Sequence, residues 1–93
     1  MFKVEEGSRF VLDRYRETIE RLRDRLKVSD KVKENYACAK VEGENVVVCI
    51  GRKYKGGGAF EEATLVAKVN GATLYAEGNV ELIEKVRRRY NLG

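Results

Sequence analysis

Two short segments of this chain have the sequence of tight turns, and each lies between runs of alternating apolar residues. Asn70-Gly71 suits a type I′ turn, in which both central residues take a positive φ, and Gly43-Glu44 suits a type II′ turn, with glycine first. A two-residue turn fixes which residues of the flanking strands lie opposite each other, and therefore which side chains share a face. The sequence thus predicts two β-hairpins.

The first hairpin is predicted to pair residues 35–42 with residues 45–52. This register places six apolar side chains on one face: Ala37, Ala39, Val41, Val46, Val48 and Ile50. The other face carries a mixed set: Tyr36, Cys38, Lys40, Glu42, Val47 and Cys49. One face is therefore expected to meet the core, while the other is only half apolar.

The second hairpin reverses at Asn70-Gly71 and has the same two-sided character. Its apolar face consists of three cross-strand pairs: Val69 with Ala72, Ala67 with Leu74, and Leu65 with Ala76. Its other face is again mixed: Thr64, Val66, Lys68, Thr73, Tyr75 and Glu77. We expect the two apolar faces to form one continuous surface.

Residues 59–69 also fit a helix. Glu61-Glu62 would lie near its start, Lys68 near its end, and Asn70-Gly71 would cap it. We favour a strand, because the segment alternates and contains β-branched residues. The mixed face of the second hairpin depends on this choice.

Helical periodicity flanks the two hairpins. Apolar residues recur at helical spacing over residues 8–28, with Ser8 as N-cap, and over residues 80–91, with Asn79 as N-cap. The second helix is expected to bury Val80, Ile83, Val86 and Tyr90. We therefore expect a single α+β domain over residues 1–93, with a short extended arm at 1–7. It comprises an N-terminal helix, a four-stranded antiparallel sheet of two hairpins, and a C-terminal helix, with both helices on one sheet face.

Composition sets the broad class of the protein. Hydrophobic residues make up 43% of the chain and charged residues 37%, as in a globular domain. No run approaches the length of about 18 apolar residues that a membrane helix needs, and no apolar segment follows Met1, so the cytoplasm is the expected location. Gln, His, Pro and Trp are absent, while Glu, Lys and Arg are abundant, which is typical of a hyperthermophile. A designed chain can share this bias, but the irregular segment 52–59 and the two cysteines favour a natural one.

The absence of histidine restricts the chemistry. Ser-His and Cys-His nucleophile systems and most zinc sites are excluded, and we expect neither a metal nor a cofactor. Glu61-Glu62 is the one carboxylate pair of interest, since a like-charged neighbour can raise a carboxyl pKa. We assign no catalytic residue and expect a protein that is not an enzyme.

Cys38 and Cys49 are cross-strand partners in the predicted register. Counted from a two-residue turn, they form a hydrogen-bonded pair, whose Cα atoms lie about 5.5 Å apart. That separation permits a disulfide bond, which is unusual in the cytosol except in hyperthermophiles. Two buried thiols are the interpretation we favour, and the disulfide is the alternative.

The segment Gly51–Gly58 has the pattern most typical of a binding site. Its glycines let backbone amides approach an anion, its cations supply charge, and Tyr54 can stack on a base. No Lys-Ser/Thr follows the glycines as in a phosphate loop, and a plain flexible surface loop is the alternative. With a net charge of +4, the chain is predicted to be a small module that binds DNA or RNA. The residues assigned to this role are Arg52, Lys53, Tyr54, Lys55, Lys40, Lys68 and Tyr75.

The mixed sheet face supports a second hypothesis. If both helices cover the other face, an exposed and partly apolar surface remains, with Tyr36, Val47, Val66 and Tyr75 at its centre. Such a patch usually marks an interface, and self-association is the commonest case. The alternative function is therefore a homodimeric structural or protein-interaction domain that uses these four residues.

Overall fold

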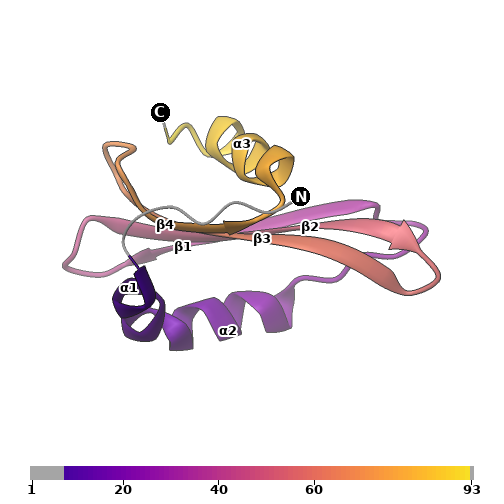
Figure 1. Ribbon diagram of the computed structural model, residues 1–93, viewed down its shortest axis with the longest axis horizontal. Coiled ribbons are helices and arrows are strands. Elements are labelled where there is room, and N and C mark those ends of the chain that lie inside the picture. The colour runs from indigo at the N-terminus through magenta and orange to yellow at the C-terminus, as the bar shows by residue number, and fades with distance from the viewer. Residues whose placement is uncertain (1–7, 93) are drawn as a thin grey trace.

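The computed structural model describes residues 8–92, in which helices precede and follow, along the chain, the strands of a four-stranded antiparallel sheet (Figure 1). The elements in chain order are α1 (Ser8–Arg14), α2 (Arg16–Arg25), β1 (Glu34–Val41), β2 (Val46–Gly56), β3 (Ala59–Lys68), β4 (Thr73–Gly78) and α3 (Val80–Arg89). The α+β class, the order of the elements and the strand over residues 59–69 are confirmed. The expected arm at residues 1–7 lies outside the described residues.

The N-terminal helix is interrupted at Tyr15, which has φ −108° and ψ 14°. Helical hydrogen bonds continue across it, since its N–H donates to the Val11 carbonyl and its own carbonyl accepts from Ile19. The ring is buried, and the hydroxyl donates to Glu44 Oε1 at 2.7 Å. The single helix predicted over residues 8–28 is therefore two helices, α1 and α2, which meet at the buried Tyr15.

The strands follow one another in the sheet in the order β1-β2-β3-β4. The longest hairpin joins β2 to β3 and reverses at three glycines, Gly56, Gly57 and Gly58, which all have positive φ. The strand predicted to end at residue 52 therefore continues to Gly56, and the irregular segment predicted over residues 52–59 is wrong for residues 52–56. Opposite charges lie across this pair of strands, Arg52 facing Glu62 and Lys53 facing Glu61, and such pairs favour an extended ladder.

Both predicted turns reverse the chain, but neither has the predicted type. The first is a four-residue loop between Val41 and Val46, in which Gly43 and Asn45 have positive φ. In the second, Gly71 alone has positive φ, and its N–H donates to the Lys68 carbonyl at 2.8 Å. The second turn therefore resembles a type I turn followed by a glycine bulge rather than type I′.

The registers of both hairpins agree with the prediction away from the turns. Val41 lies opposite Val46, and Leu65 lies opposite Ala76. Near the second turn the register shifts, so that Ala67 faces Thr73 instead of Leu74. The shift is the bulge that accommodates the wider turn.

Cys38 and Cys49 lie opposite each other and form a disulfide bond, so the alternative interpretation describes them rather than free thiols. Their Cα atoms are 4.1 Å apart. This distance is close to that of a non-hydrogen-bonded pair, about 4.5 Å, and not to the predicted hydrogen-bonded pair. Because the turn has four residues instead of two, hydrogen-bonded and non-hydrogen-bonded pairs exchange places along the hairpin, and the cysteines form a non-hydrogen-bonded pair.

The helices cover opposite faces of the sheet, so the prediction that both lie on one face is wrong (Figure 1). The α2-side core contains Tyr15, Ile19, Leu22, Leu26, Val46, Val48, Ile50, Val66 and Tyr75. The α3-side core contains Cys49, Ala63, Leu65, Ala67, Ala76, Leu82, Ile83, Val86 and Leu92. The sheet is thus the middle layer of three, with a core on each side.

The register between β2 and β3 explains this arrangement. Val48 lies opposite Val66, and Cys49 lies opposite Leu65. The apolar face of the first hairpin therefore continues into the mixed face of the second hairpin. On the other side of the sheet, the mixed face of the first hairpin continues into the apolar face of the second. Each sheet face is apolar enough to need a helix, and one helix covers each.

The exposed sheet face expected as a dimer interface is consequently absent among the described residues. Val66 and Tyr75 are 0% and 3% exposed in the α2-side core, whereas Tyr36 and Val47 pack against the α3-side core. These four residues do not even share one face. The prediction of an exposed apolar patch is therefore wrong, because it assumed that the two hairpins present their apolar faces to the same side.

The closing helix begins as predicted, with the Asn79 side chain accepting from the N–H groups of Glu81 and Leu82. Its buried residues are Leu82, Ile83 and Val86. Tyr90, predicted to be buried, is 37% exposed. The helix ends at Arg89, so Tyr90 follows the last full turn and does not continue the buried stripe.

Candidate nucleic-acid interface

The predicted basic segment lies at the outer end of the β2–β3 hairpin and divides between the two sheet faces. Side chains alternate along a strand, so Arg52 and Tyr54 share one face while Lys53 and Lys55 share the other. The Arg52 side chain donates to the carbonyl of Leu26, which follows α2, at 2.9 Å. Arg52 and Tyr54 therefore belong to the α2 side.

Two aromatic residues lie opposite each other near the hairpin end. Tyr54 on β2 is the cross-strand partner of Phe60 on β3. Phe60 is 46% exposed, and the Arg52 guanidinium lies 4.5 Å from the centroid of its ring. The Tyr54 hydroxyl accepts from the Gly58 N–H at 3.0 Å and so fixes the reversal of the chain. The hairpin end thus presents an exposed ring beside a cation.

One carboxylate on this face serves two arginines. Glu62 lies between Arg23 of α2 and Arg52 of β2, with Nε–O distances of 3.0 and 2.8 Å. A single negative charge does not neutralise two guanidiniums, and the local balance is positive. Arg52 is mostly covered, with 16% of its side chain exposed, whereas Arg23 retains 38%. Arg23 is therefore the more accessible of the two cations.

A surface hollow of about 590 Å³ separates the end of α2 from the hairpin. Its lining consists of Arg23, Asp24, Leu26, Lys27, Val28, Arg52, Gly58 and Phe60. Three cations and one carboxylate line it, together with the exposed ring. A chain of phosphates with an unstacked base fits this combination of charge and aromatic surface.

The other face of the hairpin carries Lys55 and Glu61, whose Nζ and Oε1 atoms lie 3.5 Å apart. A hydrogen bond from the Asn79 side chain, with the charge of Lys55, lowers the pKa of the Glu61 carboxyl. Glu62 points to the opposite face, toward Arg23 and Arg52. The expectation that this glutamate pair would hold a raised pKa is therefore wrong for Glu61, and the two carboxylates do not converge.

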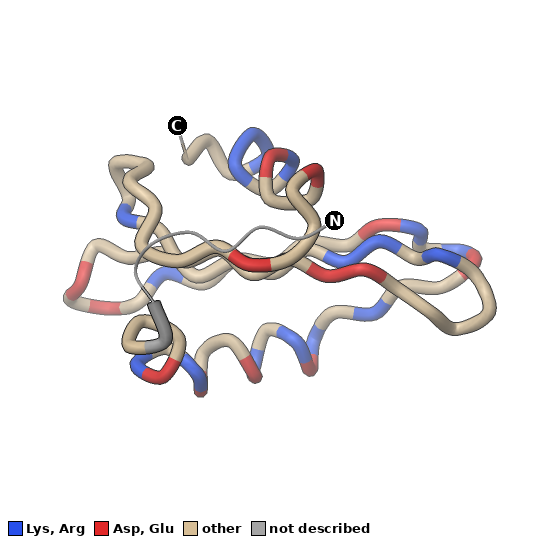
Figure 2. The backbone as a smooth tube through the Cα atoms, viewed as in Figure 1, with Lys and Arg blue, Asp and Glu red and all other residues tan. Residues whose placement is uncertain are grey.

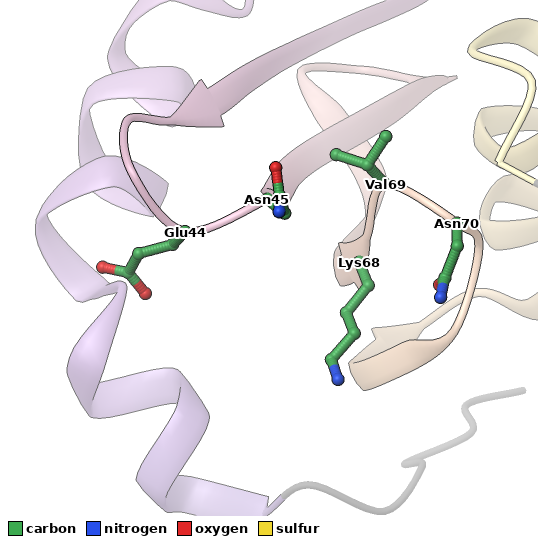
Figure 3. A pocket seen from close by; sticks show the side chains of 5 residues that line it. All are labelled: Glu44, Asn45, Lys68, Val69 and Asn70. Atoms are coloured by element: carbon green, nitrogen blue, oxygen red, sulfur yellow. The ribbon is translucent and has the colours of Figure 1, made fainter.

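The structure does not bring Lys40, Lys68 and Tyr75 to the hairpin end. Lys68 lies at the other end of the sheet and lines a hollow of about 520 Å³ with Glu44, Asn45, Val69 and Asn70 (Figure 3). Lys40 is exposed on β1, opposite Val47, and so belongs to the α3 side. Tyr75 is 3% exposed, too little to stack on a base. Figure 2 shows lysines and arginines distributed over both ends and both faces.

The aromatic ring of the hollow, Phe60, and two of its three cations, Arg23 and Lys27, were not predicted from the sequence. Phe60 follows the glycine run by two residues, and it faces Tyr54 once β2 and β3 continue to Gly56. Extending the strand alternation through residues 52–60 would have revealed this pair. No local pattern marks Arg23 and Lys27, since the approach of α2 to this sheet face is a tertiary feature.

A second polar cluster joins the start of β1 to α3. The carboxylate of Glu34 accepts from the Tyr36 hydroxyl at 2.5 Å and from Lys85 Nζ at 2.9 Å, and Arg89 lies 5.4 Å from the centroid of the Tyr36 ring. Burial, with the hydrogen bond to Glu34, raises the pKa of Tyr36 to about 12. The hydrogen bonds from Tyr36 and Lys85 lower the pKa of Glu34. The cluster holds a carboxylate and a neutral phenol in place at neutral pH.

Residues 8–92 contain no group of three or more His, Cys, Asp or Glu side chains that could hold a metal ion. None of the helices in that range combines the length and the apolar character that crossing a bilayer requires. Comparison of the chain with protein-family models, with curated proteins and with solved structures gives no match.

Proposed function

We propose that this protein binds single-stranded nucleic acid, DNA or RNA, at the end of its β2–β3 hairpin. The observation that carries the proposal is Phe60, a large aromatic side chain that is 46% exposed in a hollow with three cations. Exposed aromatic rings beside arginine and lysine are the common elements of sequence-tolerant single-strand binding. This proposal keeps Arg52 and Tyr54 of the predicted set at the site and Lys53 and Lys55 as contacts around the tip. It omits Lys40, Lys68 and Tyr75.

Each residue has a separate role in this proposal. The open face of Phe60 stacks on one base, and Arg52 holds the ring from the other side. Lys27 and Arg23 contact the phosphates that flank that base. Stacking contributes about 1–3 kcal/mol per base. The phosphate contacts release counterions, so binding weakens as salt is added.

A single strand suits the hollow better than a duplex. A base must leave its stack before it can lie on Phe60, and this is cheap only where the base is already unpaired. The cations of the hollow also lie on one side of the sheet, between α2 and the hairpin. Lys53 and Lys55 on the other side remain available to a strand that passes around the tip.

The test is fluorescence anisotropy with a labelled oligothymidine of about 12 nucleotides, a length within the usual site sizes. We expect micromolar binding that falls about tenfold between about 50 mM and 200 mM salt, and weaker binding to a duplex of equal length. Absence of salt-sensitive binding at micromolar protein would refute the proposal. Equal binding to both forms would refute its preference for single strands.

Two matched pairs of variants locate the site. Phe60→Ala is compared with Val69→Ala, which truncates an equally exposed apolar residue at the far end of the sheet. Lys27→Ala is compared with Lys40→Ala, which removes the same charge from the other side of the sheet. The first member of each pair is expected to weaken binding about tenfold and the second less than twofold. Equal losses within a pair would mean diffuse electrostatic binding rather than this site.

Self-association is the second candidate for the function. The exposed sheet face predicted as the dimer interface does not support self-association, since Val66 and Tyr75 are buried within the protomer. The observation that favours it is the edge of the sheet at β1, which pairs with β2 alone among the strands of residues 8–92.

A further inference from the structure

Within the described part of the chain, β1 is an edge of the sheet and pairs only with β2. It is eight residues long, and its centre consists of the small residues Ala37, Cys38 and Ala39. An edge of this length with small side chains leaves its backbone groups open to another strand. Helix α3 reaches β1 through side chains, Lys85 to Glu34 and Arg89 to the Tyr36 ring, and α2 also packs against this strand. Both helices lie over the faces of the sheet rather than beside its edge (Figure 1).

Three observations identify which backbone groups of β1 point outward. The Cα distance of 4.1 Å marks Cys38 and Cys49 as a non-hydrogen-bonded pair. The Tyr54 N–H donates to the Lys33 carbonyl at 2.7 Å, so the odd-numbered residues bond to β2. The Tyr36 N–H donates to the side chain of Asn35 instead, at 3.0 Å. The even-numbered residues therefore direct their N–H and C=O groups away from the sheet.

We propose that a second copy of this chain pairs antiparallel with β1, edge to edge, with Ala37 on the twofold axis. In this arrangement Glu34 lies opposite the partner subunit's Lys40, and the same contact recurs by symmetry. The result is a continuous eight-stranded sheet across two subunits. Asn35 of β1 lies opposite Arg52 and donates to the Lys27 carbonyl at 3.2 Å, so the start of this edge adjoins the hairpin hollow. The inference uses the backbone of the edge and not the cations of the hollow, and the tests of the two proposals are therefore separate.

The phase of the hydrogen bonds restricts the register. Outward-facing residues must meet outward-facing residues, so the axis passes through a residue and not between two residues. Three such axes near the centre of β1 pass through Tyr36, Ala37 and Cys38. An axis at Cys38 places Glu34 opposite Glu42 of the partner subunit, which brings two negative charges together. An axis at Tyr36 places Lys40 past the first residue of the partner strand, so that it faces no strand residue. The axis at Ala37 alone of these three matches opposite charges.

The side chains at the edge suit this register. Glu34 and Lys40 both lie on the α3 side of β1, so they meet on the same face of the joined sheet. The Glu34 side chain is 31% exposed, and its hydrogen bond from Tyr36 and ion pair with Lys85 hold the carboxylate in position. About eight backbone hydrogen bonds form between the two edges. The Asn35 side chain gives up the Tyr36 N–H, which then bonds to the partner strand.

Sedimentation velocity over a range of protein concentrations tests the assembly. We expect a reversible dimer of the wild-type chain in the micromolar range. Lys40→Glu places like charges at both symmetric contacts and is expected to raise the dissociation constant about tenfold, whereas Lys68→Glu, the same charge change away from the edge, leaves it unchanged. Lys40→Pro removes an outward N–H without affecting the ladder to β2 and is expected to abolish the dimer.

A monomeric wild-type chain at high micromolar concentration would overturn the proposal. A dimer that tolerates Lys40→Pro would overturn it as well, because another surface would then carry the contact. Circular dichroism of each variant, compared with wild type, establishes that the fold is retained.

Oxidative crosslinking tests the register separately. In a non-hydrogen-bonded pair on the twofold axis, Ala37→Cys lies opposite its own copy at a separation that suits a disulfide. Ala39→Cys is the matched control, since it makes the same change on the same face but lies opposite Asn35 of the partner subunit. We expect rapid intersubunit crosslinking of Ala37→Cys and little of Ala39→Cys. Equal or reversed rates would refute an axis at Ala37.

Discussion

At one end of the sheet the β1–β2 and β3–β4 turns lie next to each other, while at the other end the β2–β3 hairpin runs on beyond both helices (Figure 1). The two turns are joined by a backbone hydrogen bond from Val69 N–H to the Asn45 carbonyl, at 2.9 Å. Glu44 is also tied to α1 and to the bend that follows it, through Arg14 and Tyr15. The turn end is thus bound to the rest of the molecule.

The hairpin end has a different character. Its tip reverses through three successive glycines, and the space where a Cβ atom would lie at each is open. Its aromatic pair contributes an exposed ring instead of a buried one. The side chains and backbone of the turn end thus stabilise the fold, whereas the hairpin end exposes side chains that contribute little to the core. Such surface is where binding residues concentrate.

The largest expected effect is a loss of stability when a glycine is replaced in the body of the sheet rather than at the hairpin tip. Gly78 has φ +110°, and a Cβ there would lie 2.3 Å from the Glu62 carbonyl oxygen, so Gly78→Ala is expected to cost about 3 kcal/mol or more. Gly57 also has a positive φ, +62°, but a Cβ there would meet no atom within 4 Å. Gly57→Ala should therefore lower the free energy of unfolding by about 1 kcal/mol. Urea unfolding measures both. Equal losses would show that the backbone conformation alone decides the cost.

The next effect concerns the bond between Cys38 and Cys49. It closes a short loop around the β1–β2 turn, and its reduction is expected to lower the free energy of unfolding by about 2–3 kcal/mol. Unfolding with and without reductant measures the loss. Amide exchange should then accelerate in β1 and not at the tip of the β2–β3 hairpin. Uniform acceleration across the sheet would contradict a local role.

A smaller effect distinguishes the tyrosines at the two ends. The hydrogen bond from Tyr15, with the charge of Arg14, lowers the pKa of Glu44 below its ordinary value of 4.5. A lowered carboxyl pKa stabilises the fold above the unfolded value, and this stabilisation disappears as the pH falls through the folded value. Tyr15→Phe should therefore destabilise the protein more at neutral pH than in acid.

Tyr54→Phe is the control for that prediction. The Tyr54 hydroxyl accepts from a backbone N–H at the hairpin tip, so its loss should be independent of pH in the acid range. Thermal unfolding of both variants at neutral and acidic pH makes the comparison. A Tyr15→Phe deficit that persists unchanged in acid would mean that packing, and not the ionised Glu44, is responsible.

The smallest effect on stability is expected for Phe60→Ala. Because the ring is 46% exposed, the free energy of unfolding should change by no more than about 0.5 kcal/mol. Oligonucleotide affinity should nevertheless fall, as proposed above. A large loss of stability would show that Phe60 is part of the fold and would remove the contrast between the two ends.

Local patterns in the sequence accounted for much of the secondary structure. Asn79 caps α3 as its amide and position indicate, and both turns occur where glycine follows or precedes a polar residue. The choice of a strand over residues 59–69 was correct because alternation and β-branched residues favour it. The turn types were wrong, since loop length and bulges adjust to the neighbouring elements rather than to two residues.

The candidate site was predicted only in part. Of the predicted residues, Arg52 alone lines the hollow, and Tyr54 lies beside it as the cross-strand partner of Phe60. The hollow is not lined by the other five, Lys53, Lys55, Lys40, Lys68 and Tyr75. Their assignment required all of them to share one exposed face. The structure divides that face, because Tyr75 is buried in the α2-side core whereas Lys40 lies on the α3 side of β1.

The sequence by itself determined the alternation of each hairpin, the places where the chain reverses and the residues that begin the last helix. These features depend on side chains within a few positions of one another. Only the tertiary structure decided how the two hairpins align, because the pairing of Val48 with Val66 depends on how far β2 and β3 extend before they turn. That one register makes both faces of the sheet apolar and draws a helix to each.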